Sequence, residues 1–318
     1  MEHFERPDGD AVLPIGGRTV KKITSISLGS SVRDHRAEIT LEGETYQLER
    51  IGTNGDMEVA RRKFEELDGK VDVLSMGGTD LFFYLGNRRY PVRDAHRMVR
   101  NVKKTPVADG SKLKVVLEYG TINKLIAQGI LKPEMKVLMI SAVDRFGMAQ
   151  ALAESGCSVT YGDFMYSLGM NIPLRRLSTV RFMAMLLLPI IGLLPFSFFY
   201  PTGKKQEENK PKFSQYFHWA DVVAGDYNYI ARYMPKEMTG KTLITNTVTA
   251  KDIEALKALG VRTLITTTPE IGGRSFGTNV IEGILVCKTG KRAEDLGEEE
   301  TRQLLTRFGF EPRIVQLA

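Results

Sequence analysis

The 318-residue sequence has few cysteines and histidines. Its two cysteines, Cys157 and Cys287, lie far apart in apolar contexts, which argues against a disulfide framework and indicates reduced, buried thiols. None of the four histidines has the close spacing of paired metal ligands, so no metal site is expected. The first twenty residues carry acidic side chains and no apolar core, unlike a signal peptide. The sequence therefore predicts a cytoplasmic protein in which residues 1–20 form a flexible extension.

A clustered basic tract is also missing. Basic residues exceed acidic ones by six, but the excess is scattered along the chain. Proteins that bind nucleic acid usually gather lysine and arginine on one face, often with stacking aromatic side chains between them. The sequence therefore predicts solvated basic surfaces and no nucleic-acid partner. A chain of this length with 42% hydrophobic residues can bury two moderate cores, so two domains are expected.

Residues 21–112 predict an N-terminal α/β module rich in hairpins. Residues 23–28 alternate apolar and polar side chains, which is typical of a half-exposed strand. Two hairpins are indicated at 37–49 and 81–92, each with a glycine in its turn, and residues 57–67 have helical composition.

Strands alternate with helices over residues 132–290, after a linking helix expected at 113–131. This alternation predicts a Rossmann-like domain with a mostly parallel, doubly wound sheet. A further helix and an edge strand are expected within 291–318. The predicted fold class is therefore α/β, with a hairpin-containing module followed by a Rossmann-like domain.

The segment 182–200 is almost wholly apolar and forms an expected helical insertion at 181–203. It is long enough to cross a bilayer, but Pro189, Gly192 and Pro195 interrupt it. Three interpretations remain: a membrane span, a helical hairpin that enters a membrane surface beside basic residues, or a flap buried in the interdomain cleft or against a partner chain. The flap is favoured, and both peripheral membrane contact and a homo-oligomer stay open.

Open parallel sheets bind ligands beyond the carboxyl ends of their strands. The strand–turn–helix–strand unit at 136–163 predicts a dinucleotide over the turn that contains Ser141, Asp144 and Gly147, with Asp163 on the adenosine ribose. The turn lacks the G-x-G-x-x-G pattern, so an α/β unit without a ligand is the alternative. A carboxylate at the ribose repels a 2′-phosphate, and NAD is therefore preferred over NADP.

The glycine-rich loop 272–279 is the other candidate for holding a phosphate, because it precedes an apolar helix and carries several donors. An ordinary connection with a helix cap is the alternative. The cofactor-binding residues expected on this side are Thr267, Gly273, Ser275 and Gly277.

Strand ends of the first module are expected to line a cleft. Ser30, Arg33 and His35 are predicted to hold a polyol or a carboxylate, although a histidine between charged neighbours is also typical of a plain surface. A lysine that leaves an apolar flap can take part in proton transfer, or it can simply anchor the flap. The predicted catalytic residues are Lys204, Asp226 and Asp80.

Four phrases of the sequence together resemble bacterial proteins labelled quinate 5-dehydrogenase or shikimate/quinate dehydrogenase-like. The phrases lie at 27–35, 141–147, 200–206 and 273–279, and the resemblance extends over residues 22 to about 290. It implies an NAD(P)-dependent oxidoreductase that interconverts an alcohol and a ketone on a cyclic hydroxy acid. Residues 22–110 lack the N-x-T-x-P-x-K stretch of that family, so no catalytic residue is carried over from it.

The leading hypothesis is a cytoplasmic, NAD-dependent dehydrogenase acting on a hydroxy acid or polyol such as quinate or shikimate. The first alternative is a non-catalytic ligand-binding or membrane-peripheral α/β protein. The second is a transferase that binds a nucleotide sugar between its halves. A small molecule is the expected partner in each case.

Overall fold

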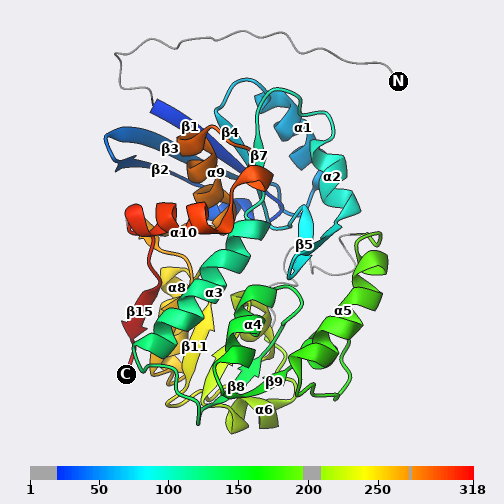
Figure 1. Cartoon of the computed structure of the whole chain (residues 1–318), viewed down its shortest axis with the longest axis vertical. Coiled ribbons are helices and arrows are strands. Elements are labelled where there is room, and N and C mark those ends of the chain that lie inside the picture. The colour runs from blue at the N-terminus through cyan, green and yellow to red at the C-terminus, as the bar shows by residue number, and fades with distance from the viewer. Residues whose placement is uncertain (1–19, 196–208, 272–273) are drawn as a thin grey trace.

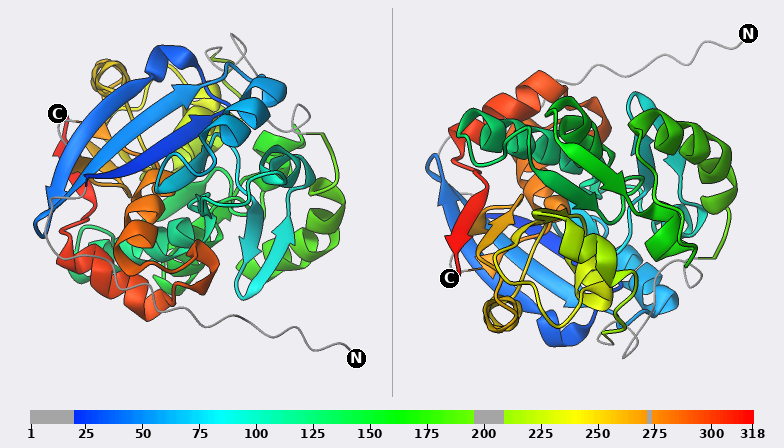
Figure 2. Two further views of the ribbon diagram at one scale, coloured as in Figure 1. Left: turned by 90° about the horizontal axis from the view of Figure 1, so that it is seen from above. Right: turned by 90° about the horizontal axis from the view of Figure 1, so that it is seen from below.

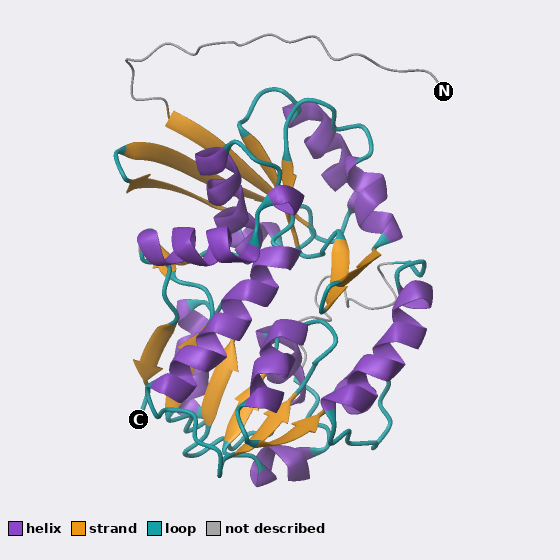
Figure 3. Cartoon of the chain, viewed as in Figure 1, coloured by secondary structure: helices purple, strands orange, loops and turns teal. Residues whose placement is uncertain are grey.

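The computed structural model describes residues 20–195, 209–271 and 274–318. Within them the chain forms two α/β lobes, each built on a mostly parallel sheet (Figures 1 and 3). The predicted α/β class is therefore confirmed. The expected extension at 1–20 lies almost entirely outside the described residues.

The first lobe has a five-stranded sheet in the order β2-β3-β1-β4-β7. Its strands are β1 (Val20–Ser27), β2 (His35–Leu41), β3 (Glu44–Gly52), β4 (Val73–Gly77) and β7 (Val107–Ala108). β1 is parallel to β3 and β4, β4 is parallel to β7, and β2 forms the predicted hairpin with β3. Helices α1 (Met57–Leu67) and α2 (Arg93–Val99) cover one face, and β5 (Phe82–Leu85) and β6 (Arg88–Pro91) form the second predicted hairpin.

The second lobe has a six-stranded sheet in the order β15-β12-β11-β10-β8-β9. Its strands are β8 (Lys136–Met139), β9 (Ser158–Tyr161), β10 (Val222–Ala224), β11 (Thr242–Thr245), β12 (Thr263–Thr266) and the antiparallel edge strand β15 (Arg313–Gln316). The helices of this lobe are α3 (Ser111–Ala127), α4 (Phe146–Glu154), α6 (Ser214–Trp219), α7 (Tyr227–Tyr233) and α8 (Ala250–Ala258).

Side chains of the second sheet alternate between two buried faces. Val137, Met139 and Val222 join the core under α3 and α4. Leu138 and Val223 join the core under α6, α7 and α8 on the opposite face. A parallel sheet that is covered on both faces needs apolar side chains in both registers, which explains the continuous apolar runs that mark these strands in the sequence.

The C-terminal helices return to the first lobe. Helix α9 (Thr278–Thr289) and helix α10 (Glu298–Arg307) pack in one core with β1, β2, β3 and β4. The prediction that β1 is half-exposed is therefore wrong: Ile23 to Ser27 are all buried, because α9 covers one face and α1 with α2 the other. The polar residue Ser25 is tolerated there because Asn279 Nδ2 donates to its hydroxyl oxygen at 2.8 Å.

Several segments join the lobes. The chain passes between them at 109–111, between β12 and α9, and at 308–313. Helix α3 runs from one lobe into the other (Figure 1): its first turns pack in the core of the first lobe, while its last turns pack beside α4. The junction is therefore built around α3.

The expected apolar insertion forms helix α5 (Leu177–Ile191). One of its faces, with Ala184 and Leu188, packs against Leu85 of β5 and Phe146 of α4. Figure 2 shows α5 beside the β5–β6 hairpin at one side of the molecule. The inner face of α5 is thus buried against both lobes, which is compatible with the favoured flap. Residues 196–203 of the insertion lie outside the described residues. Among the helices that are described, none has the length and apolar character to cross a membrane.

Candidate ligand site at the junction of the two lobes

The parallel strands of both sheets point their carboxyl ends toward the junction, and charged side chains follow three of these ends. Asp80 follows β4, Asp144 follows β8 and Asp226 follows β10. Lys114 of α3 joins the first two, since its Nζ donates to Asp80 Oδ2 at 2.5 Å and to Asp144 Oδ1 at 3.2 Å. One lysine therefore bridges the first lobe to the second.

Arg145, beside this lysine, is the centre of a second group of ion pairs. Its guanidinium donates to Glu118 of α3, and its Nη2 donates to Asp226 Oδ2 at 2.8 Å. Asn246, which follows β11, donates to the same Asp226 oxygen at 2.9 Å. The side chains of Arg145 and Glu118 are only 5% and 1% exposed, so this pair is effectively removed from water.

The electrostatics of the cluster follow from burial. Burial raises the pKa of Glu118 to about 7, although Arg145 and Lys114 act in the opposite direction. Burial likewise raises the pKa of Asp80, again against the effect of Lys114. For Asp144 burial also favours the neutral form, but Lys114 and Arg145 outweigh it and lower the pKa. Four carboxyl groups thus face two cations, an arrangement that does not favour an anionic ligand.

A small pocket opens beside Lys114. It is lined by Asp80, Phe82, Phe83, Tyr84, Ser111, Lys114, Val115 and Asp144. The Ser111 side chain is 2% exposed, and its hydroxyl has no hydrogen-bond partner within the described part of the chain. A buried hydroxyl without a partner is costly, so this group is suited to bind a ligand or a water molecule.

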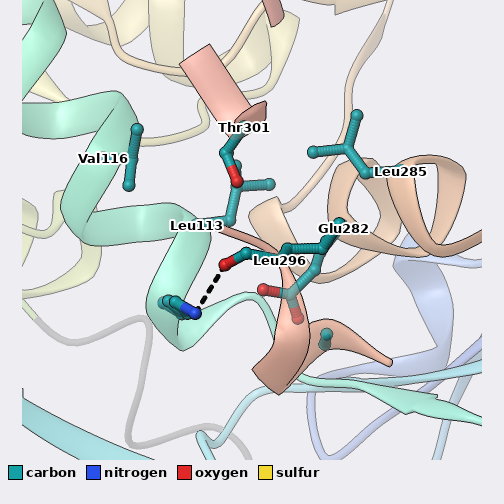
Figure 4. Close-up of a pocket in the computed structure, with 8 residues that line it drawn as sticks. Leu113, Val116, Glu282, Leu285, Leu296 and Thr301 are labelled. Carbon is teal, nitrogen blue, oxygen red and sulfur yellow. Dashed lines mark hydrogen bonds between the residues drawn. The ribbon is translucent and has the colours of Figure 1, made fainter. Parts of the chain in front are cut away.

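A second pocket lies where α3, α9 and α10 meet (Figure 4). Glu282 of α9 points at the start of α3, where its Oε2 accepts the backbone N–H of Gly110 at 2.8 Å. Burial and the nearby Asp109 raise the pKa of Glu282 to about 8. Lys112 Nζ donates to the carbonyl of Leu296 at 2.5 Å, so the pocket is enclosed by contacts that hold the helices together.

The turn predicted to hold a dinucleotide is occupied by the protein itself. Asp163 Oδ1 accepts the backbone N–H groups of Ala142 and Val143 at 3.0 and 2.9 Å, so this carboxylate closes the turn after β8. A Cβ on Gly147 would lie 2.4 Å from the carbonyl oxygen of Val115, because α3 packs directly on the start of α4. Backbone donors and space that a pyrophosphate needs are thus taken, and Ser141 beside them is only 7% exposed.

The residues expected on the far side of the cofactor lie in different surroundings. Thr267 is 1% exposed, and its hydroxyl has no partner in the ranges that are described. Ser275 lies in β14 (Arg274–Ser275), which pairs with β13 (Glu270–Ile271), and Gly277 is the N-cap of α9. Gly273 and Lys204 lie outside the described residues.

The predicted substrate residues lie after β1. The Ser30 hydroxyl accepts the N–H of Val32 at 3.2 Å and caps a single 3₁₀ turn, in which Arg33 is exposed. The His35 ring lies 5.0 Å from that of Phe276, which precedes α9 and packs in the core of the first lobe. This contact therefore joins β2 to the segment before α9 within the first lobe.

Lys114, Glu118, Arg145 and Ser111 were not predicted as site residues. Lys114 and Glu118 lie four residues apart in a largely apolar helix, and this opposite-charge pair was the available signal. An isolated pair of this kind usually lies on a solvated helix face. Only the packing of α3 between the lobes makes it part of a buried cluster.

Two family models match the chain, and both are described only as domains of unknown function. DUF8753 matches residues 22–109, and DUF8754 matches residues 112–317. No curated protein matches.

Several solved structures match over most of their length, at about 10% identity. A Caulobacter myo-inositol binding protein with bound myo-inositol is 10% identical, with 96% of each chain covered and a TM-score of 0.38. A periplasmic solute-binding protein of an Actinobacillus succinogenes ABC transporter with bound D-allose is 10% identical, with 93% and 98% covered and a TM-score of 0.37. A periplasmic ribose ABC transporter protein from Conexibacter woesei is 8% identical, with 92% and 97% covered and a TM-score of 0.35. Their ligands and compartment are properties of those proteins.

These comparisons correct the functional predictions. Assignment to the quinate/shikimate dehydrogenases is wrong, because the family models that match residues 22–109 and 112–317 are domains of unknown function. The predicted oxidoreductase activity and the NAD cofactor are withdrawn with it, in agreement with the occupied turn at Asp163. The predicted cytoplasmic location is withdrawn as well.

Proposed function

The chain belongs to the family described as a domain of unknown function, DUF8754, and we propose that it binds a small polyhydroxylated molecule between its lobes without catalysis. The observation that carries this proposal is the pocket beside Lys114. Its lining comes from both lobes and combines carboxylates, an ammonium group, the unpartnered Ser111 hydroxyl and three aromatic side chains. Pockets with apolar walls and a few convergent polar groups are typical of small-molecule sites.

The ligand class follows from the polar groups. Asp80 and Asp144 offer acceptors, Lys114 offers donors, and the Ser111 hydroxyl can do either. An alcohol is a donor and an acceptor at once, so neighbouring hydroxyls can satisfy all of these groups. The excess of carboxyl groups disfavours phosphates and nucleotides, whereas Phe82 and its aromatic neighbours suit the apolar face of a ring.

A binding role also fits the state of the charged groups. Burial favours the neutral form of Lys114, but Asp144 and Asp80 outweigh it and raise the pKa of the ammonium group. Burial acts in the same way on Arg145, where Glu118 and Asp226 raise the pKa. Neither cation is therefore poised to give up its proton. Their function in the proposal is to hold the carboxylates in fixed orientations.

For the second lobe we propose a doubly wound, Rossmann-like sheet, in which β8 is the first strand and the order reverses between β8 and β10. Two features support it: the strand order β9-β8-β10-β11-β12 and the helices packed on both faces. The proposed division places residues 21–112 in the first domain and 132–290 in the second, with α9 reaching back to the first sheet. Ser30, Arg33 and His35 are proposed to form the rim of the site, because they follow the carboxyl end of β1.

Thermal-shift titration of the full chain against a panel of sugars and cyclic polyols tests the proposal. A ligand at 100 times its dissociation constant stabilises a protein by about 2.7 kcal/mol, which raises the melting temperature of a chain of this size by roughly 5 °C. Ser111→Ala should weaken the best ligand roughly tenfold, which corresponds to the loss of one hydrogen bond. Ser178→Ala, at an exposed serine of α5, is the matched control and should bind normally.

Three outcomes would count against the proposal. Absence of a shift with every polyol would remove its support. A shift with diamines alone would overturn the ligand class, since carboxylates bind cations too. A shift with NAD or another nucleotide would contradict the argument that the carboxyl groups at the junction disfavour anionic ligands.

A further inference from the structure

Exposed apolar side chains of the described residues are concentrated in one part of the chain. Of ten large hydrophobic side chains that are exposed, seven lie between Leu168 and Leu193. Four of them occur at helical intervals on α5 and just after it: Phe182, Leu186, Ile190 and Leu193, with exposures of 56%, 54%, 59% and 59%. These four side chains are called the α5 outer face below.

The α5 outer face is not needed to hold α5 in place. Val180, Ala184 and Leu188, on the opposite side of the helix, are at most 2% exposed. The N–H of Arg93 donates to the carbonyl of Gly192 at 2.8 Å, which ties the end of the helix to the first residue of α2. One face thus attaches α5 to the protein, while the other presents apolar side chains to the surroundings. Apolar surfaces of this kind usually mark an interaction site.

The sequence segments that form α5 and the adjoining hairpin carry charges of a single sign. No aspartate or glutamate occurs from residue 164 to residue 206, nor in the hairpin segment from residue 81 to residue 93. Exposed arginines border the helix: Arg176 and Arg181 on its own segment, and Arg88 and Arg89 on β6. The Nη1 of Arg88 lies 3.9 Å from the sulfur of Met185, so this hairpin arginine flanks α5 in space although it is distant in sequence.

We propose that the α5 outer face and its flanking arginines dock the protein on a membrane surface that contains anionic lipids. Exposed leucine, isoleucine and phenylalanine side chains would enter the boundary between headgroups and acyl chains, while the arginines contact lipid phosphates. A second copy of this chain would bring arginines against arginines. The charge pattern therefore favours an anionic lipid surface over self-association.

Flotation of the full-chain protein with vesicles tests this docking. Binding is expected to vesicles of phosphatidylglycerol and phosphatidylcholine in equal parts, to weaken as salt is raised, and to be weak with phosphatidylcholine alone. Leu186→Ser with Ile190→Ser should lower the partition coefficient roughly tenfold for each side chain. The matched control is Ile314→Ser, an exposed apolar residue of β15 in the second lobe, which should leave binding unchanged.

Charge variants test the electrostatic part. Arg176→Gln and Arg181→Gln should each weaken binding to anionic vesicles about fivefold, whereas Lys251→Gln on α8 should not. Equal binding to neutral vesicles, or equal losses in the control variants, would overturn the proposal. Absence of vesicle binding would also overturn it. So would a dimer detected by light scattering, if the double variant Leu186→Ser with Ile190→Ser were a monomer. Unchanged melting temperatures of the variants establish that they are folded.

Discussion

The two lobes carry sheets of the same kind, yet they bury them by different means. In the second lobe, apolar side chains occupy both faces of β8, β10, β11 and β12, and helices that are close in sequence cover them. In the first lobe, β1 carries Thr24, Ser25 and Ser27, all at most 4% exposed. One of its faces is covered by α9, which follows β12, the last parallel strand of the second sheet, in the chain.

The difference shows how a polar strand can be central in a sheet. Asn279 of α9 donates to Ser25 across 254 positions of sequence, and Ser75 of β4 donates to the carbonyl of the same Asn279 at 3.0 Å. Hydrogen bonds from α9 thus replace water for the polar side chains of β1 and β4. A partner so distant cannot be recognised in the local pattern, which is why β1 resembles a half-exposed strand.

Loss of Arg145 should have the largest effect, because it breaks the junction on which both lobes depend. Arg145→Met leaves Glu118 and Asp226 buried without their cation, and we expect a loss of about 3–5 kcal/mol in the free energy of unfolding. Urea denaturation measures it. The double variant Glu118→Met with Arg145→Met should recover a large part of the loss, whereas a double variant as unstable as the single one would contradict this account.

Gly110→Ala should have the second-largest effect on the free energy of unfolding, because it strains the segment that leads from the first sheet into α3. Gly110 has φ +75°, and a Cβ there would lie 2.3 Å from the backbone nitrogen of Asn279. Strain and overpacking together should cost roughly 2–4 kcal/mol. Gly129→Ala is the matched control, since Gly129 has φ +67° with open space around it, and about 1 kcal/mol is expected. Equal losses in the free energy of unfolding for the two variants would show that the backbone of α9 leaves room for a Cβ at position 110.

Asn279→Ala tests the hydrogen bonds to β1 that distinguish the first lobe from the second. The variant leaves the Ser25 hydroxyl buried without its donor, and we expect a loss of about 1–3 kcal/mol in urea denaturation. Ser25→Ala should cost far less in the Asn279→Ala background than in the wild type, because its partner is already missing. Additive losses would mean that the two side chains act independently.

The smallest effect, taken per pH unit, is expected from a change of pH. The pKa of Glu282 is raised from 4.5 to about 8 by burial and by Asp109, so the folded state favours the protonated carboxyl. Its contribution to stability is therefore complete below about pH 4.5 and is lost as the pH rises toward 8. The free energy of unfolding should fall by at most about 1.4 kcal/mol per pH unit in this window. Glu282→Gln should flatten this slope, and a slope identical to that of the wild type would refute the assignment.

Secondary structure was predictable wherever local signals agree. The sequence predicts a helix over 57–67, and α1 (Met57–Leu67) has those bounds, with Asp56 as its N-cap. Both hairpins of the first lobe and the alternating strands of the second were recognised from glycine turns and apolar runs. These features depend on neighbours a few residues away, which a sequence pattern records directly.

The candidate site was predictable only in part. Asp80, Asp144 and Asp226 follow strand ends, and the structure gathers them around α3. Asp163 also follows a strand, but its carboxylate is bound to two backbone N–H groups. The same position after a strand therefore led to a carboxylate paired with a lysine or arginine side chain in one case and to a carboxylate bound to the backbone in another. Which of the two results depends on the nearest donors in space.

The sequence by itself determined the α/β class, most strands and helices, and the apolar character of α5, because these follow from periodicity, turn residues and composition. The tertiary structure alone decided that α9 covers the first sheet, that α3 carries a buried lysine and glutamate between the lobes, and that one face of α5 stays exposed. The physical reason is that burial, charge pairing and pKa depend on atoms brought together from positions as much as 254 residues apart.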